Sequence, residues 1–202
     1  DLSNMPENAS EEQRTIFFDV KCSMALEEAI EKLGGLPRMV RTGHTFMKKE
    51  LRNNPDSPMA GEMSGHFFMN DHWDGFDDAI YCAARLLSIV GKDPAPEQGG
   101  PEFSERFGFM PEYPTTDEGK VPLVGDREEV MEKVVLAFSD MPTSTVDGIR
   151  VRYDDGWYLC RPSNTEPILV MRAEGRNQEA LDHILSDVGG RIGEIVDLEN
   201  LR

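Results

Sequence analysis

The sequence is poor in cysteine, in positive charge and in long hydrophobic runs. Its three cysteines, Cys22, Cys82 and Cys160, are widely spaced and form no Cys-x-x-Cys pair, which argues against a disulfide framework and a zinc knuckle. No apolar stretch approaches the ~18 residues of a membrane helix, and no basic segment followed by an apolar one marks a signal peptide. We therefore expect a cytoplasmic protein with reduced cysteines and no membrane partner.

Acidic residues outnumber basic ones: the chain has 38 Asp and Glu residues but 21 Lys and Arg residues, which gives a formal net charge of −17. Such a surface repels a nucleic-acid backbone unless one face is strongly basic. We therefore expect no nucleic-acid partner. A small anionic ligand would need positive charge gathered locally, and Arg161 is a candidate for that role.

The first ninety residues alternate between strand-like and helix-like patterns. Strands are predicted at 15–20, 36–41 and 67–69, and helices at 24–33, 45–52 and 76–90. This rhythm is typical of an α/β unit. The third helix has an apolar face that we expect to pack in the core, made of Phe76, Ile80, Ala83, Ala84, Leu87 and Val90.

Glycine and proline are concentrated between residues 91 and 114, so we place the domain boundary there. The predicted division is a first domain at 1–92, a linker at 93–114 and a second domain at 115–202. The second domain is expected to hold a strand at 121–124, a helix capped by Asp126, a hairpin around Asp155-Gly156 and a last helix at 178–188. Along the helix after Asp126, apolar residues recur every four positions at Val130, Val134 and Phe138.

A polar loop at 161–167, Arg161-Pro162-Ser163-Asn164-Thr165-Glu166-Pro167, joins two strand-like runs and combines groups that bind phosphate. Arg161 offers a planar fork of donors that matches two phosphate oxygens, and Ser163 and Thr165 add hydroxyls. Asn164 tolerates the left-handed backbone conformation, which would let successive N–H groups converge on an anion. An ordinary polar turn with a solvated arginine is the alternative.

A second polar loop, at 61–66, precedes the strand predicted at 67–69. Glu62, when ionised, offers two oxygens to neighbouring sugar hydroxyls, and Ser64 and His66 can donate or accept beside it. The loop therefore predicts a site that recognises a diol.

A metal site is the weaker alternative for this region, where Asp, Glu and His are frequent between residues 62 and 78. The spacing matches neither a His-Glu-x-x-His helix nor a calcium loop. We expect Asp77 and Asp78 to face solvent near a helix N-terminus, where negative charge is favourable.

The two loops together, GEMSGH at 61–66 and RPSNTEP at 161–167, resemble the sugar- and phosphate-recognition loops of the α-D-phosphohexomutase family. FFDVKC at 17–22 and RTGHTFMKK at 41–49 are similar to the same family, and Met63 and Asn164 favour its phosphomannomutase/phosphoglucomutase branch. The resemblance implies the last two of four domains: an α/β domain with a mixed sheet, then a smaller α+β domain with an antiparallel sheet.

The resemblance also implies roles for individual residues. The expected sugar contacts are Lys21, Glu62, Met63, Ser64 and Gly65, and the expected phosphate contacts are Arg161, Ser163, Asn164, Thr165 and Arg172. His44 or His66 could assist proton transfer, since imidazole titrates near neutral pH. The alternative for each histidine is a structural hydrogen bond, and for Arg172 it is a cross-strand pair with an acidic neighbour.

The reaction that the resemblance implies is the interconversion of hexose 1- and 6-phosphates of mannose or glucose. Its phosphoserine loop and its aspartate-rich magnesium loop have no counterpart in these 202 residues, so we expect no metal site and no activity without the missing N-terminal domains. The alternatives are a phosphoglucosamine mutase fragment, in which Gln and Gly usually replace Met63 and Asn164, and a noncatalytic sugar-phosphate-binding module.

Overall fold

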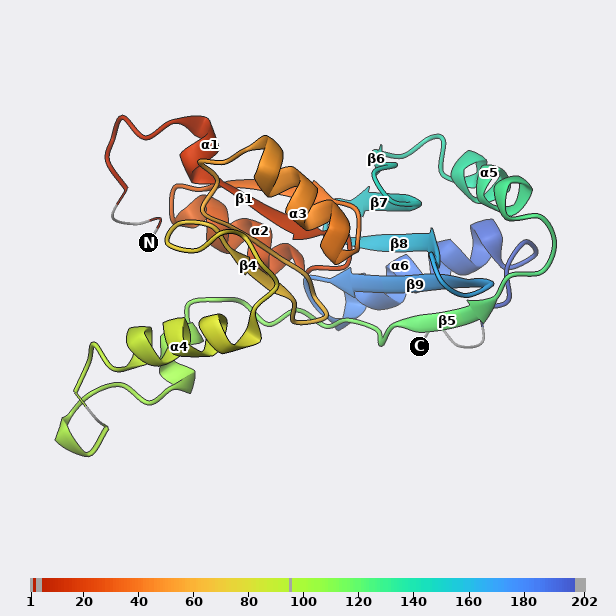
Figure 1. Cartoon of the computed structure of the whole chain (residues 1–202). Coiled ribbons are helices and arrows are strands. Elements are labelled where there is room, and N and C mark those ends of the chain that lie inside the picture. Colours follow the sequence, from red (N-terminus) through yellow and green to blue (C-terminus); the bar gives the residue numbers. More distant parts are fainter. Residues whose placement is uncertain (1, 3–4, 95, 199–202) are drawn as a thin grey trace. The chain divides into compact units, whose positions relative to one another are not determined.

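The chain divides into two compact units, Asp1–Glu112 (unit 1) and Tyr113–Arg202 (unit 2). The computed structural model describes residues 2, 5–94 and 96–198, and Figure 1 shows the elements of each unit. Most of the segment predicted as a linker falls in unit 1, where it carries two short 3-10 helices, η2 (Pro96–Gln98) and η3 (Ser104–Phe107).

Unit 1 is built on a four-stranded sheet with the strand order β2-β1-β3-β4. Its strands are β1 (Thr15–Asp19), β2 (Leu36–Val40), β3 (Met59–Gly61) and β4 (Phe67–Met69). β2 and β3 run parallel to β1, while β4 is antiparallel to β3, so the sheet is mixed, as the family resemblance implies. The carboxyl ends of the three parallel strands share one edge, where ligand-binding loops gather in α/β folds.

Helices cover both faces of this sheet, because alternate residues of β1 point to opposite sides. Ile16 and Phe18 pack with α2 (Met24–Lys32), and Phe17 packs with α3 (His44–Asn53). Ser23 caps α2, since its side chain accepts a hydrogen bond from the Ala25 N–H. A short helix, α1 (Glu11–Arg14), begins in a capping box between Ser10 and Gln13 that the sequence reading did not recognise.

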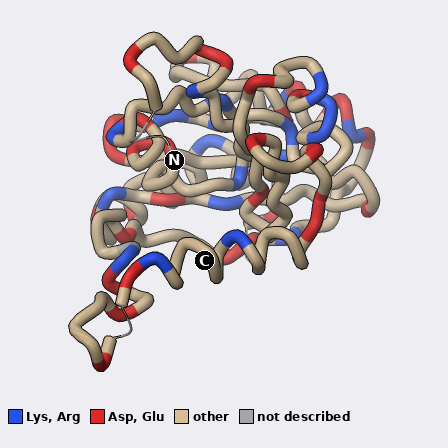
Figure 2. Tube along the Cα trace, turned by 60° about the vertical axis from the view of Figure 1, so that its left-hand side comes forward, with Lys and Arg blue, Asp and Glu red and all other residues tan. Residues whose placement is uncertain are grey.

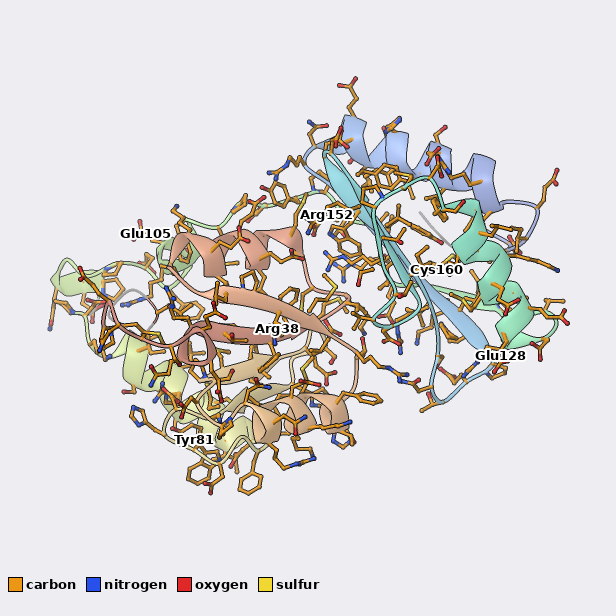
Figure 3. The ribbon with its side chains drawn as sticks, turned by 90° about the horizontal axis from the view of Figure 1, so that it is seen from above. Arg38, Tyr81, Glu105, Glu128, Arg152 and Cys160 are labelled. Carbon is orange, nitrogen blue, oxygen red and sulfur yellow. The ribbon has the colours of Figure 1, made fainter. Side chains whose placement is uncertain are left out.

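The prediction for the third helix is wrong in its orientation. The helix α4 (Ala79–Val90) starts later than expected and contains no buried residue. Ile80 is 85% exposed and Leu87 is 72% exposed, so the apolar face predicted for the core faces outward. Periodicity reveals that a helix has an apolar face but not whether another layer covers it. Tyr81 on α4 (Figure 3) is partly buried, and its ring stacks on that of Trp73.

Unit 2 is an antiparallel five-stranded sheet with the order β5-β9-β8-β7-β6. Its strands are β5 (Gly119–Pro122), β6 (Thr143–Ser144), β7 (Ile149–Tyr153), β8 (Gly156–Pro162) and β9 (Ile168–Gly175). The strand predicted at 121–124 is therefore shifted, since pairing with β9 begins at Gly119 and Val124 is exposed.

Two helices, α5 (Arg127–Ala137) and α6 (Gln178–Ile192), share one apolar core with the sheet of unit 2. Val130, Val134 and Phe138, the apolar residues that recur every four positions, are buried in it. α6 continues through Gly189-Gly190, beyond its predicted end, because Ile192 is also fully buried in this core. Cys160 on β8 (Figure 3) lies in the same cluster.

Charges of both signs are interspersed along the chain (Figure 2). All three cysteines are free; Cys22 and Cys160 are buried, whereas Cys82 is only partly so. Within the described part of the chain, no helix has the length and apolar character needed to span a membrane.

Candidate functional site

The carboxyl ends of the parallel strands in unit 1 are tied together by a buried aspartate. Asp19, the last residue of β1, is fully buried. Its carboxylate accepts three hydrogen bonds, two from side chains and one from a backbone N–H. Its Oδ1 accepts from Cys22 Sγ at 3.1 Å and from the Met63 backbone N–H at 3.3 Å, and its Oδ2 accepts from Thr42 Oγ1 at 3.0 Å. The carboxylate therefore links the ends of β1 and β2 to the 61–66 loop.

The 61–66 loop is a tight turn between β3 and β4. The Glu62 N–H donates to the His66 carbonyl and the Gly65 N–H donates to the Glu62 carbonyl, each at 2.9 Å. Gly65 has a φ of 88°, a left-handed conformation that favours glycine. The turn leaves Met63 and Ser64 exposed while Glu62 is buried at its base.

One carboxylate oxygen of Glu62 is engaged and the other is not. Oε2 accepts from the Ser64 hydroxyl at 3.3 Å. Oε1 is buried and has no hydrogen-bond partner among the described residues. A buried polar atom without a partner is costly, so its presence at the base of an exposed loop indicates a place for a ligand donor.

Burial raises the pKa of the Glu62 carboxyl above its ordinary value of 4.5, and the nearby charge of Asp19 raises it further. His66, the Ser64 hydroxyl and the Gly43 backbone act in the opposite direction. The elevated pKa has the direction expected for a buried carboxyl beside a second carboxylate.

The remaining predicted residues of unit 1 have different surroundings. Lys21 is buried just beyond β1. His44 is exposed and opens α3 at the same edge of the sheet as Asp19. His66 is exposed, and its Nδ1 lies 2.7 Å from Asp77 Oδ2, so its ring is oriented by an ion pair or hydrogen bond.

The 161–167 loop joins β8 to β9 in unit 2, between two strands as predicted. Its backbone is closed by Ser163: the Thr165 and Glu166 N–H groups both donate to Ser163 Oγ at 3.3 Å. Two amides thus converge on one oxygen position. The expectation for Asn164 is wrong in one respect, because no residue other than glycine has positive φ in the described part of the chain. The hydroxyl of Ser163, rather than a left-handed Asn164, draws the turn together.

Arg161 is buried at the start of this loop and is held by Asp147. Its Nε donates to Asp147 Oδ2 at 2.7 Å, and both side chains are almost fully buried. Among the described residues, Nε is the one nitrogen of this guanidinium with a hydrogen-bond partner. The ion pair therefore fixes the plane of the guanidinium and leaves both terminal nitrogens to offer N–H groups to a ligand.

The turn that carries Asp147 approaches the backbone at Arg161 very closely. A Cβ on Gly148 would lie 2.3 Å from the Cys160 carbonyl oxygen and 2.6 Å from the Arg161 Cα, and the φ of Gly148 is 72°. Both constraints demand glycine. Sequence reasoning missed Asp147, although an Asp-Gly pair directly before a strand was the available signal.

Two further arginines lie on elements next to the 161–167 loop. Arg127, which opens α5, donates from a terminal nitrogen to the Ser163 carbonyl and was not predicted as a site residue. Arg172 on β9 donates from Nε to Thr115 Oγ1 at 3.1 Å. Arg172 pairs with Leu159 in the sheet, two residues from Arg161 along β8.

The described residues contain no group of three or more His, Cys, Asp or Glu side chains placed to hold a metal ion.

Comparison with protein-family models gives a match to each unit. Residues 2–111 match the model described as "Phosphoglucomutase/phosphomannomutase, alpha/beta/alpha domain III". Residues 116–189 match the model described as "Phosphoglucomutase/phosphomannomutase, C-terminal domain".

Curated relatives and solved structures agree with these matches. A phosphomannomutase/phosphoglucomutase of Pseudomonas syringae is 42% identical over 171 residues, which cover 84% of this chain and 36% of the relative. A phosphoglucomutase of Neisseria meningitidis is 37% identical over 174 residues, with the same coverage. The crystal structure of a phosphoglucomutase/phosphomannomutase family protein from Burkholderia thailandensis superposes with a TM-score of 0.76 at 32% identity, covering 92% of this chain and 41% of that one. The chain thus spans little more than a third of these relatives.

Proposed function

The chain belongs to the phosphoglucomutase/phosphomannomutase family, and from that premise we propose that it is the C-terminal half of a phosphomannomutase/phosphoglucomutase. In this proposal it binds a mannose or glucose phosphate during the interconversion of the 1- and 6-phosphates. The 61–66 loop contacts the sugar hydroxyls, and the 161–167 loop contacts the phosphate that is not being transferred.

The observation that carries the proposal is that each loop presents unused hydrogen-bonding groups of the required kind. Glu62 has a buried acceptor oxygen with no partner in the described part of the chain, which suits a sugar hydroxyl donor. Arg161 has two terminal nitrogens directed by the pair with Asp147, which suit phosphate oxygens. Ser163 adds a position on which two amides converge, and a phosphate oxygen could take the place of its hydroxyl there.

The chain alone is proposed to bind without turning over. Phosphoryl transfer requires a positioned nucleophile and charge neutralisation on the moving group. We assign the phosphoserine, the aspartate-rich loop and its magnesium to the N-terminal part of the longer enzyme, and no step assigned to this chain runs through them. The branch preference for mannose or glucose over glucosamine rests on Met63 and Asn164. The free cysteines are compatible with a cytoplasmic protein.

A titration followed by amide chemical shifts tests the proposal. Glucose 6-phosphate is expected to shift amides in both loops, whereas glucose alone shifts those of 62–66 and inorganic phosphate shifts those of 163–166. We expect dissociation constants of about millimolar or weaker, because half a site must still overcome the cost of ordering its ligand. A coupled assay of the chain with magnesium and glucose 1,6-bisphosphate should show no turnover.

The proposal would be wrong if glucose 6-phosphate left both loops unshifted at tens of millimolar. Mutase activity that co-purifies with the chain and disappears in Arg161→Ala would instead overturn the division of roles, because the nucleophile would then lie in these 202 residues.

A further inference from the structure

We propose that Asp19 is the positioning residue of the sugar-recognition loop: its buried carboxylate fixes the 61–66 loop against the end of β2 so that Glu62 presents its unpaired oxygen. This inference rests on the proposed function for the identity of the ligand. The contacts that support it all lie within unit 1 and involve no ligand.

The first support is the number of separate segments that meet on one carboxylate. Cys22 follows β1, Thr42 follows β2 and Met63 follows β3, and each donates a hydrogen bond to Asp19. All three segments follow the carboxyl ends of parallel strands. Hydrogen bonds to an ionised acceptor are roughly twice as strong as neutral ones, so a carboxylate is well suited to holding three chain segments in one geometry.

The second support is the position of the Met63 amide. Met63 directly follows Glu62, so the bond from its N–H to Asp19 Oδ1 fixes the peptide group adjoining the residue that is proposed to read the sugar. The turn itself is closed by bonds between Glu62, Gly65 and His66, all within the loop. Those bonds set the shape of the loop, whereas the bond from the Met63 N–H to Asp19 ties the loop to the end of β1.

The third support is electrostatic. Asp19 is fully buried and lies close enough to raise the pKa of Glu62 by its charge. The other groups that act on the Glu62 carboxyl are His66 and Ser64 from its own loop and the Gly43 backbone after β2. Placing a buried carboxylate next to a second carboxyl costs free energy unless hydrogen bonds to the carboxylate compensate for it. The three donors give Asp19 that compensation.

Two variants separate the effect of the hydrogen bonds to Asp19 from the effect of its negative charge. Asp19→Asn keeps the shape and leaves an oxygen for Cys22 and Met63, while its amide group can face the Thr42 hydroxyl; the charge is lost. Thr42→Val removes one donor to the carboxylate and keeps the charge. Ser57→Ala is the matched control, because the fully buried Ser57 hydroxyl donates to the Thr15 carbonyl at 2.7 Å, at the opposite end of β1.

The measurements use the full 202-residue chain without ligand: hydrogen exchange of the Met63 amide relative to the amides of β1, and the titration of the Glu62 side-chain carboxyl by carbon-13 NMR. Asp19→Asn should speed Met63 exchange about fivefold, since a neutral bond replaces a charge-assisted one, and move the Glu62 titration to lower pH. Thr42→Val should speed Met63 exchange while the Glu62 titration stays high. Ser57→Ala should change neither quantity, even though it lowers overall stability.

A final arm measures glucose 6-phosphate binding, which Asp19→Asn is expected to weaken about tenfold, with inorganic phosphate binding unchanged. If the wild-type chain bound no sugar phosphate, the proposed function would fail while the ligand-free results still decided the role of Asp19. Unchanged Met63 exchange and an unchanged Glu62 titration in Asp19→Asn would overturn the inference. If Asp19→Asn failed to fold, Thr42→Val would decide: Met63 exchange that equals the wild type would overturn it as well.

Discussion

Unit 2 buries its apolar residues in one continuous cluster, whereas unit 1 divides them between two smaller clusters and leaves α4 uncovered. The two candidate loops differ in the same way. In unit 2 the buried Arg161 is compensated by Asp147, while in unit 1 the buried Glu62 keeps an oxygen without a partner and lies near a second negative charge. The buried charge at the loop of unit 2 therefore has an ionic partner, whereas among the described residues the buried carboxyl at the loop of unit 1 has none.

The largest effect is expected when isoleucine is replaced by alanine in two helices that differ in burial, α6 of unit 2 and α4 of unit 1. Ile184 on α6 is fully buried and Ile80 on α4 is 85% exposed. Ile184→Ala should lower the free energy of unfolding by about 2–5 kcal/mol, because it leaves a cavity in the core. Ile80→Ala should change it by no more than about 0.5 kcal/mol.

Denaturant unfolding followed by fluorescence measures both. Trp157 reports on unit 2 in a Trp73→Phe background, and Trp73 reports on unit 1 in a Trp157→Phe background. If Ile80→Ala destabilised unit 1 as strongly as Ile184→Ala destabilises unit 2, the apolar face of α4 would be covered in solution and the contrast between the units would be lost.

The same contrast explains which parts of the fold could be predicted from the sequence. Most helices and the longer strands followed from local patterns, as at Val130, Val134 and Phe138, which recur every four positions and face one core. The short strands β3 and β6 were missed, and the mixed and antiparallel sheets were expected from the family resemblance rather than from local patterns. The burial of α4 could not be predicted, because periodicity shows that a face is apolar but not whether a further layer lies against it. The end of α6 was misjudged because the burial of Ile192 outweighs the low helix propensity of Gly189-Gly190.

The site shows a similar limit. The residues of the two loops could be chosen from their chemistry, since guanidinium, hydroxyl and carboxylate groups have known preferences. The residues that hold them, Asp19 and Asp147, could not, because each acts on a partner distant in sequence: Met63 lies 44 positions from Asp19, and Arg161 lies 14 from Asp147. Only the fold brings these pairs together.

The second prediction tests the charge pairing of unit 2. Arg161→Lys keeps a positive charge but loses the planar fork and the bond from Nε to Asp147. A charge-assisted hydrogen bond contributes roughly 1.5–3 kcal/mol, so glucose 6-phosphate should bind at least about tenfold more weakly. Calorimetry or chemical-shift titration measures this, with Arg152→Lys on the neighbouring strand β7 as the control. Equal losses in the two variants would mean that total charge, rather than the geometry of Arg161, determines binding.

The third prediction tests the unpaired acceptor of unit 1. Glu62→Gln replaces an oxygen with an N–H donor, which mispairs with a sugar hydroxyl. It should weaken glucose 6-phosphate and mannose 6-phosphate alike and leave inorganic phosphate binding nearly intact. Glu128→Gln, on the exposed side of α5 (Figure 3), is the control and should leave all three unchanged. A matching loss of inorganic phosphate binding in Glu62→Gln would show that the two loops have been assigned to the wrong parts of the ligand.

The smallest expected effect concerns pH, and its sign should be opposite in the two units. Burial and Asp19 raise the pKa of Glu62 above 4.5, so its protonated form is favoured in the folded state. Its contribution to stability is present below the unfolded-state pKa and is lost as pH rises through the folded-state pKa. In unit 2, hydrogen bonding to Arg191 lowers the pKa of Asp140 below 3.8, so its contribution is present above the unfolded-state pKa and is lost as pH falls through the folded-state pKa.

Fluorescence-monitored unfolding of each unit between about pH 3 and 7 measures these slopes, and because many other carboxyl groups titrate in this range, each slope is taken as the difference from a neutral variant. Relative to Glu62→Gln, unit 1 should lose stability as the pH rises above 4.5. Relative to Asp140→Asn, unit 2 should lose stability as the pH falls below 3.8. The Asp140 difference should be the smaller, because this carboxylate is largely exposed and water screens its ion pair with Arg191. Differences of the same sign would mean that Glu62 is stabilised as a carboxylate like Asp140, and the contrast between an uncompensated and a compensated acid would not hold.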